Sequence, residues 1–236
     1  MSQDKTKHIG IVGWSIGESS FGVTKSYLEY FSKFGVVEIL TPQEGIRQGL
    51  DLVVLPGGKD TPSYRYGSAP SFMNSESDAY KEYFFEVNLQ QYIDAQVPIF
   101  GICLGMQQIA VKYGSVITQH MYHPSSSPRW ELTHKISQPV RDDAGNLLYY
   151  PELDTLKLKE VAKNREVKVN SLHHQAVRWN NVGSDLEILY VDEDGEYVEA
   201  LKHKRLNVVG VQWHPEEIND KFSNKTIINL LNGIKI

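Results

Sequence analysis

Cysteine is almost absent from this sequence, which has one, Cys103, among 236 residues. A single cysteine excludes an internal disulfide framework and favours a reducing, cytoplasmic setting. No apolar run approaches the ~18 residues of a transmembrane helix, and the polar segment 1–7 lacks the apolar region of a secretory signal. We therefore expect a cytoplasmic protein that does not associate with membranes.

Positive charge is in the minority, and the formal net charge is −5. A general nucleic-acid binder would carry an excess of lysine and arginine, so we expect no nucleic-acid partner. The dinucleotide-binding pattern Gly-x-Gly-x-x-Gly is missing from the glycine-rich loop at 13–22. Hydrophobic residues at 41% and charged residues at 22% are ordinary for a globular protein, and we expect one domain over 1–236.

Strand-like and helix-like segments alternate in the first half of the chain. The expected strands lie at 8–14, 36–40, 50–55 and 97–102. This alternation favours right-handed βαβ crossovers and a mostly parallel sheet flanked by helices. Ligands bind such sheets at the carboxyl ends of the strands, so the residues that follow each strand are the candidates for a site.

Two helices of this half carry clear start or stop signals. The first is expected to present its apolar face as far as Phe34 and to end at Gly35. The second is expected to start from a cap at Asn74 or Ser75 and to reach about Ala95.

The second half predicts a smaller antiparallel region and a closing helix. The expected features are a turn at 141–146, a strand–corner–strand unit at 167–177, strands at 186–191, 197–201 and 208–213, and a helix around 227–231. Three histidines, His120, His123 and His134, fit no recognised ligand spacing, so we expect no metal site.

The segment Gly101-Ile102-Cys103-Leu104-Gly105 has the form of a nucleophile elbow. An apolar strand leads into it and a helix-like segment follows, while glycines two residues to either side allow a sharp turn. Such a turn pushes the side chain of Cys103 out at the carboxyl end of the sheet. Cys103 is therefore the candidate nucleophile, although a lone cysteine in an apolar run is more often a buried small residue.

A cysteine nucleophile needs a base, and the base needs a group that orients it. His214 and Glu216 follow an expected strand and provide both. If the strand is extended through them, residues two apart point to one side, and the Glu216 carboxylate can hold the imidazole. The acid follows the histidine here, whereas an α/β-hydrolase places it before.

Backbone N–H groups are the expected donors to a developing oxyanion. Leu104, at the start of the helix after the elbow, supplies one, and Gly58 in the Pro56-Gly57-Gly58 turn supplies the other. Only a glycine-rich backbone approaches a reacting group without a side chain in the way.

Two segments, Gly101–Gln107 and Gly210–Glu216, resemble the class I glutamine amidotransferase superfamily. Three stretches further resemble its γ-glutamyl-γ-aminobutyrate hydrolase branch: Leu55–Pro62, Val169–Gln175 and Val198–Ala200. The resemblance covers roughly 9–218. It implies an α/β, flavodoxin-like fold with a central, mostly parallel sheet and a smaller antiparallel region.

The resemblance also implies a chemistry. A Cys103–His214–Glu216 triad would attack a γ-glutamyl amide, form a γ-glutamyl thioester and release glutamate with water. No metal or organic cofactor is implied. The residues implied to lie at the substrate are Gly57, Gln107, Asn170, Ser171, Leu172 and His173.

Leu104 departs from the branch, whose members often have arginine after the nucleophile. The leaving group is therefore open between ammonia from glutamine and a larger amine from a small-molecule γ-glutamyl conjugate. His173 and His174 could contact this leaving group or could simply bond to the backbone at their corner. The alternative function is a glutaminase subunit that delivers ammonia to a separate synthase partner.

Overall fold

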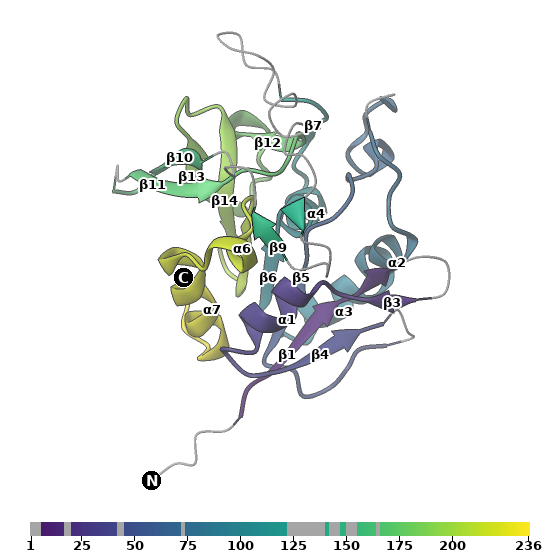
Figure 1. The fold of residues 1–236 in the computed structure, drawn as a ribbon. Helices are drawn as coiled ribbons and strands as arrows, with labels where there is room; N and C mark the ends of the chain where they lie inside the picture. The colour runs from purple at the N-terminus through teal and green to yellow at the C-terminus, as the bar shows by residue number, and fades with distance from the viewer. Residues whose placement is uncertain are drawn as a thin grey trace.

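Five parallel strands form one side of the sheet that organises this protein (Figure 1). The computed structural model describes residues 6–16, 20–41, 45–71, 74–121, 140–141, 147–149, 155–163 and 166–236. The parallel strands run in the order β15 (Val208–Val211), β6 (Ile99–Ile102), β5 (Leu52–Leu55), β1 (His8–Val12) and β4 (Val36–Leu40). Because β15 pairs parallel with β6, the carboxyl ends of these strands meet at one edge. The predicted parallel sheet is confirmed.

Antiparallel strands from the second half extend this sheet beyond β15. They follow in the order β14 (Tyr197–His203), β13 (Leu186–Asp192), β10 (Thr155–Glu160) and β11 (Glu166–Asn170). On the other side of β14, β12 (Ala176–Arg178) pairs with it and with β7 (Ile117–Thr118). The strand–corner–strand unit predicted at 167–177 is therefore confirmed, with β11 and β12 as its two strands.

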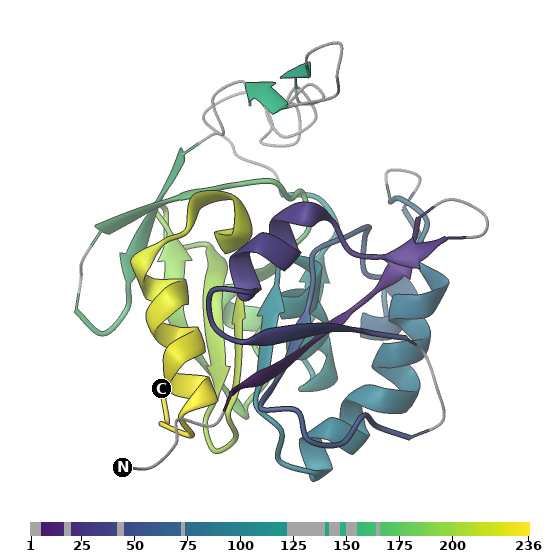
Figure 2. The same ribbon diagram turned by 60° about the horizontal axis from the view of Figure 1, so that its bottom comes forward.

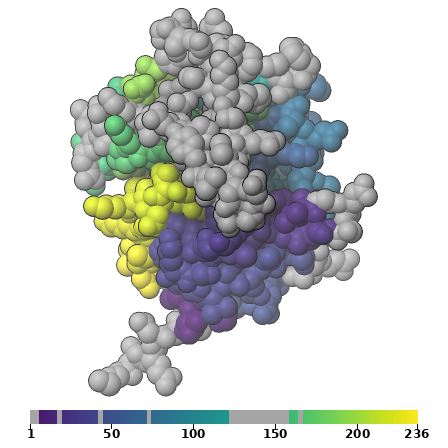
Figure 3. Space-filling view, in the orientation of Figure 1, coloured from purple at the N-terminus to yellow at the C-terminus, as the bar shows by residue number. Residues whose placement is uncertain are grey.

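Helices cover both faces of the sheet. Helices α1 (Lys25–Phe31) and α7 (Lys221–Leu231) pack on one face, and α2 (Ala79–Tyr83), α3 (Leu89–Asp94) and α4 (Leu104–Lys112) pack on the other (Figure 2). Each face has its own buried apolar cluster. In the space-filling view, the N-terminal segment in purple adjoins the C-terminal segment in yellow (Figure 3). Segments from the two halves of the chain therefore lie side by side on this face of the molecule.

Short elements complete the described chain. They are the pair β2 (Trp14–Ser15) and β3 (Phe21–Gly22), the pair β8 (Val140–Arg141) and β9 (Leu147–Tyr149), 3₁₀ turns at Ser63–Tyr66 and Trp179–Asn181, and α6 (Pro215–Ile218). The expected turn residues 142–146 lie outside the described residues, as do His123 and His134. None of the described helices has the length and apolar character needed to span a membrane.

The helix expected up to Ala95 differs from the prediction at its start and in its middle. It consists of α2, a π-helical turn at Phe84–Asn88, and α3. Its cap is Asp78, whose carboxylate accepts hydrogen bonds from the first backbone N–H groups, including that of Lys81 at 3.0 Å. The cap predicted at Asn74 or Ser75 is wrong, because the Ser75 N–H donates instead to Asp60 at 2.7 Å.

The first helix is also shorter than predicted. Helix α1 ends at Phe31, and the N–H of Phe34 donates to the Phe31 carbonyl at 2.9 Å, which closes a tight final turn. The end predicted at Gly35 is therefore wrong by about one turn of helix. Phe34 still packs against the apolar cluster on this face, so the apolar pattern reported burial correctly even where the helix had stopped.

Candidate active site

Cys103 occupies the turn between β6 and α4 in a backbone conformation that side chains rarely adopt. Its φ is 51° and its ψ is −104°, which is a strained geometry for a residue other than glycine. Its N–H donates to the Val211 carbonyl at 2.8 Å, tying the turn to β15. A methyl group on Gly101 would lie 2.6 Å from the Gly105 carbonyl carbon, so the glycines permit this close packing. The elbow predicted from the sequence is present.

His214 and Glu216 meet at the start of a helix and not along a strand. β15 ends at Val211, His214 is the N-cap of α6, and Pro215 is the first helical residue. Glu216 folds back within the first turn, and its Oε1 lies 2.6 Å from His214 Nδ1. The extended strand assumed for these residues is therefore wrong, although the two side chains do meet.

The charge on Glu216 sets the protonation of His214. Burial by itself would lower the pKa of the imidazole, but the negative charges of Glu216 and Cys103 outweigh it and raise the pKa well above its usual value. The Glu216 side chain is only 2% exposed, so solvent screens this pair weakly. The effect of Cys103 on this pKa shows that the imidazole lies close to the sulfur on the elbow.

Two further residues hold the histidine–glutamate pair in place. The Asn170 side chain accepts a hydrogen bond from the His214 N–H at 2.8 Å and donates one to the His214 carbonyl at 3.1 Å. The buried Tyr27 hydroxyl lies near Glu216. Its pKa is raised well above its usual value, mainly by burial and to a smaller extent by the negative charge of Glu216. Asn170 was expected at the substrate, and in this structure its side chain braces the backbone of His214.

The loop after β5 lies directly over Cys103 and His214. A methyl group on Gly57 would come within 2.6 Å of His214 Cε1 and 3.5 Å of Cys103 Cβ. The N–H of Gly57 donates to the Tyr27 hydroxyl at 2.8 Å. Within the described parts of the chain, the N–H groups of Gly58 and Leu104 have no hydrogen-bond acceptor. Neither of the two predicted oxyanion donors is engaged by a described residue, so each can donate a hydrogen bond to an oxygen of a ligand.

A buried polar network lies beneath the nucleophile. Gln212, which is fully buried, donates from Nε2 to Cys103 Sγ at 3.5 Å and accepts from Gln107 Nε2 at 3.3 Å. Gln107 also donates to the Gln175 carbonyl at 2.9 Å and accepts from the Thr61 hydroxyl at 3.3 Å. Gln107 was expected at the substrate, and here its amide groups are engaged by protein partners.

The corner after β11 places its residues in different surroundings. Leu172 lines the cavity together with His214 and Glu216, whereas Ser171 and His173 are buried. His173 Nδ1 lies 3.1 Å from the Gln175 carbonyl. His174 Nε2 lies 2.8 Å from Asp60 Oδ1, and its ring stacks on that of His120. Of the two roles considered for the corner histidines, contact with the leaving group or a bond to the backbone, the bond of His173 matches the second.

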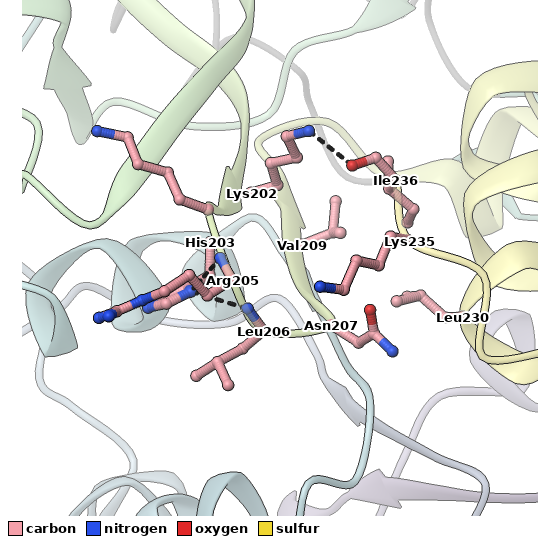
Figure 4. A pocket seen from close by; sticks show the side chains of 10 residues that line it. Lys202, His203, Arg205, Leu206, Asn207, Val209, Leu230, Lys235 and Ile236 are labelled. Atoms are coloured by element: carbon pink, nitrogen blue, oxygen red, sulfur yellow. Dashed lines mark hydrogen bonds between the residues drawn. The ribbon is translucent and has the colours of Figure 1, made fainter.

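A cavity of about 610 Å³ opens at the carboxyl ends of the parallel strands. It is lined by Trp14, Ser15, Thr24, Tyr27, Gly57, Gly58, Lys59, Asp78, Lys81, Leu172, His214, Glu216 and Glu217. A second pocket lies at the opposite end of β15, in the turn after β14, where Lys202 donates to the Ile236 carbonyl (Figure 4). That pocket encloses about 20 Å³, which is room for about one water molecule. The larger cavity is therefore the candidate active site.

Several residues of this site escaped the sequence analysis, and Tyr27, Lys81 and Gln212 are the ones that contact its central groups. Gln212 stands two residues before His214, and a search for polar residues at the end of an apolar strand could have found it. Tyr27 and Lys81 lie on helices that mix polar and apolar residues, and no local sequence pattern distinguishes them from their neighbours.

The family of the chain follows from comparison with known proteins. A model of the peptidase C26 family matches residues 16–216. The chain belongs to the peptidase C26 family. This finding confirms the resemblance to the class I glutamine amidotransferase superfamily that the two main motifs carried.

Individual relatives of this peptidase C26 member point the same way. The glutamine amidotransferase-like protein YvdE of Lactococcus lactis is 30% identical over 88% of this chain and 90% of its own. The γ-glutamyl-CDP-amidate hydrolase of Campylobacter jejuni is 27% identical over 71% of this chain and 62% of its own. Component 2 of anthranilate synthase from Methanocaldococcus jannaschii is 26% identical over 61% and 60% of the two chains.

Solved structures support the fold. A glutamine amidotransferase from Thermotoga maritima superimposes with a TM-score of 0.55 at 15% sequence identity, covering 97% of this chain and 90% of the other. The architecture is thus that of the class I glutamine amidotransferases. The family is of hydrolase and amidotransferase type, which supports an enzyme.

Proposed function

We propose that this protein is a cysteine hydrolase that cleaves γ-glutamyl amide bonds through a γ-glutamyl thioester. The observation that carries the proposal is the position of Cys103. It sits on a strained elbow beside the His214–Glu216 pair and beneath a glycine loop with a free N–H, and both that pair and that loop line the cavity. These are the parts that acyl transfer by a cysteine requires.

In the first half of the reaction, the Cys103 thiolate attacks the γ-carbonyl carbon. The carbonyl electron pair moves onto oxygen, and the N–H groups of Gly58 and Leu104 stabilise the resulting charge. As the carbon–nitrogen bond breaks, His214 transfers its proton to the leaving nitrogen. The amine departs and a γ-glutamyl thioester remains on Cys103.

In the second half, water replaces the amine. His214, now neutral, takes a proton from the water, whose oxygen attacks the thioester carbonyl. The carbon–sulfur bond breaks, glutamate leaves, and Cys103 and His214 return to the thiolate and imidazolium pair. Glu216 keeps its hydrogen bond to Nδ1 throughout, so that Nε2 is the nitrogen that exchanges protons.

Binding of the γ-glutamyl group is assigned to the residues around the same cavity. Leu172 and Gly57 are in direct reach, because both line it. Ser171 and His173 contribute through the backbone and the shape of the corner, and Asn170 and Gln107 act by holding His214 and the floor of the site. The proposed substrate is thus a small molecule, and the mechanism uses no metal or organic cofactor.

A second candidate function is supported by Leu104 and by one relative. An apolar residue after the nucleophile matches ammonia-supplying amidotransferases, and the anthranilate synthase component 2 named above is a subunit of a larger enzyme. In this alternative the chain releases ammonia from glutamine for a separate synthase. It would then be nearly inactive by itself.

One experiment separates the two functions. Purified protein is assayed for glutamate release on glutamine and on a panel of γ-glutamyl amines, beside Cys103→Ala. Fast turnover of a conjugate that Cys103→Ala abolishes supports the hydrolase. Turnover of glutamine only when a synthase is added supports the subunit, and full activity of Cys103→Ala refutes both. A third variant, Glu216→Gln, should slow the same turnover, and Glu187→Gln, which alters an exposed carboxylate on β13, is its control.

A further inference from the structure

Lys81 is a buried cation in the wall of the cavity. Its side chain leaves the first turn of α2, and the residue is only 4% exposed. The ammonium lies 4.3 Å from the centre of the Trp14 ring, in a cation–π contact. Lysine is rarely buried unless a partner requires it there. Among the described residues, the hydrogen-bond partner of Lys81 Nζ is the carbonyl oxygen of Gly57.

The Gly57 carbonyl belongs to the same peptide group as the Gly58 N–H. No described peptide bond is cis, and in a trans peptide the C=O and N–H point in opposite directions. The contact with Lys81 therefore fixes on which side the Gly58 N–H emerges. Two successive glycines allow many backbone conformations, so this peptide needs an external anchor to keep one orientation.

We propose that Lys81 is a positioning residue for the oxyanion site. It holds the Gly57–Gly58 peptide so that the Gly58 N–H faces the substrate carbonyl, and its charge polarises that peptide so that the N–H donates more strongly. The inference rests on the proposed function, in which Gly58 stabilises the oxyanion. In this role Lys81 stabilises the transition state through the Gly58 N–H and does not itself contact the substrate.

The surroundings of Lys81 make its charge sensitive to pH. Burial lowers the pKa of Lys81 to about 8, against the opposing effect of the negative charges of Asp78 and Cys103. Asp78 caps the same helix, and Cys103 approaches from the elbow. The other charged or titratable groups lining this cavity are Tyr27, Lys59, His214, Glu216 and Glu217. The contribution of Lys81 is greatest below about pH 8, where the ammonium is charged.

The test compares Lys81→Met and Lys81→Arg with the wild type. Lys25→Met is the control, because it removes the same charge from an exposed position on α1. Glutamate release provides kcat and KM. Alkylation of Cys103 by iodoacetamide, taken at its high-pH plateau, reports the nucleophile alone, since that displacement builds no oxyanion.

We expect Lys81→Met to lower kcat about 10- to 100-fold with KM changed less than about threefold, because losing an oxyanion donor entirely costs 10²–10³. Its plateau alkylation rate should stay within about twofold of wild type. Lys81→Arg should recover part of kcat and lose the fall in activity near pH 8, because arginine stays charged. Lys25→Met should behave as wild type.

Different failures have different meanings. Wild-type kcat in Lys81→Met refutes the role of Lys81 and leaves the proposed function standing. Equal losses of kcat, alkylation rate and thermal stability in both Lys81 variants show a merely structural residue and also refute it. Absence of glutamate release by the wild type, with or without a synthase, refutes the proposed function and this role together.

Discussion

Replacement of Lys81 by Met should make the folded protein more stable at neutral pH. Burial lowers the pKa of the ammonium from its usual 10.5 to about 8, and each pKa unit corresponds to ~1.4 kcal/mol. Keeping this group charged in the folded state therefore costs roughly 3 kcal/mol. Against this, Lys81→Met loses a hydrogen bond of about 1 kcal/mol and a cation–π contact of about 1 kcal/mol. The net expectation at pH 7 is a gain of about 1 kcal/mol.

The dependence on pH has a definite sign. Between about pH 8 and pH 10.5, unfolded wild type binds a proton at Lys81 that the folded protein has released, so wild-type stability rises with pH there. Lys81→Met lacks this titration, and its advantage should shrink by roughly 3 kcal/mol across that range. Tyr27 and Tyr30, whose pKa values burial raises, titrate alike in both proteins and cancel from the difference.

Urea unfolding from pH 7 to pH 10 measures this difference. Both proteins should carry Cys103→Ala, so that the single thiol does not contribute to the measurement. A difference in free energy of unfolding that stays constant with pH would refute the reasoning. So would a loss of more than about 1 kcal/mol in Lys81→Met at pH 7, since the charge penalty outweighs a hydrogen bond of about 1 kcal/mol. A variant that is more stable yet slower would show that Lys81 is kept for function at a cost in stability.

Three further substitutions test the triad and its supports. Glu216→Gln should lower kcat about 10- to 100-fold, because it removes a charge-assisted hydrogen bond of ~1.5–3 kcal/mol. It should also move the limb of the pH–rate profile that reports His214 to lower pH. A limb that does not move would contradict the role of the Glu216 charge. Gly57→Ala places a methyl group 2.6 Å from His214 Cε1 and so displaces the imidazole. Small displacements of catalytic groups are costly, so kcat should fall at least about tenfold. The temperature of thermal unfolding should change little. Asn170→Ala removes both hydrogen bonds to the His214 backbone and should cost about 1–3 kcal/mol in urea unfolding together with kcat, whereas an effect on KM alone would make Asn170 a substrate contact.

The features predicted correctly are those with a local cause. The elbow around Cys103 is a pattern of adjacent residues: an apolar strand, two glycines and a helix start. The parallel sheet follows from alternating periodicities, and the limits of β4 at Val36 and Leu40 were predicted to the residue. Such patterns specify local structure through backbone sterics and the burial of apolar residues a few positions apart. The same local structure therefore forms in any tertiary context that buries the strand.

The errors arise where a nonlocal contact outweighs a local preference. Ser75 is a good cap residue by type, but Asp60, from another loop, binds it, and Asp78 becomes the cap of α2. His214 and Glu216 were placed on an extended strand, yet Pro215 starts a helix there. The pairing of the two side chains was predicted from the wrong geometry, because residues two apart can also meet when the chain folds back at a helix start.

The fold class, the family and the candidates Cys103, His214 and Glu216 follow from short motifs whose order along the chain can be read directly. The surroundings of these residues depend on how distant segments pack. Asn170 reaches the backbone of His214, and Lys81 reaches the carbonyl of Gly57, because strands and helices distant in sequence pack at one edge of the sheet. The energies of those contacts come from burial and close approach, which depend on the packed chain and leave no pattern in any single segment.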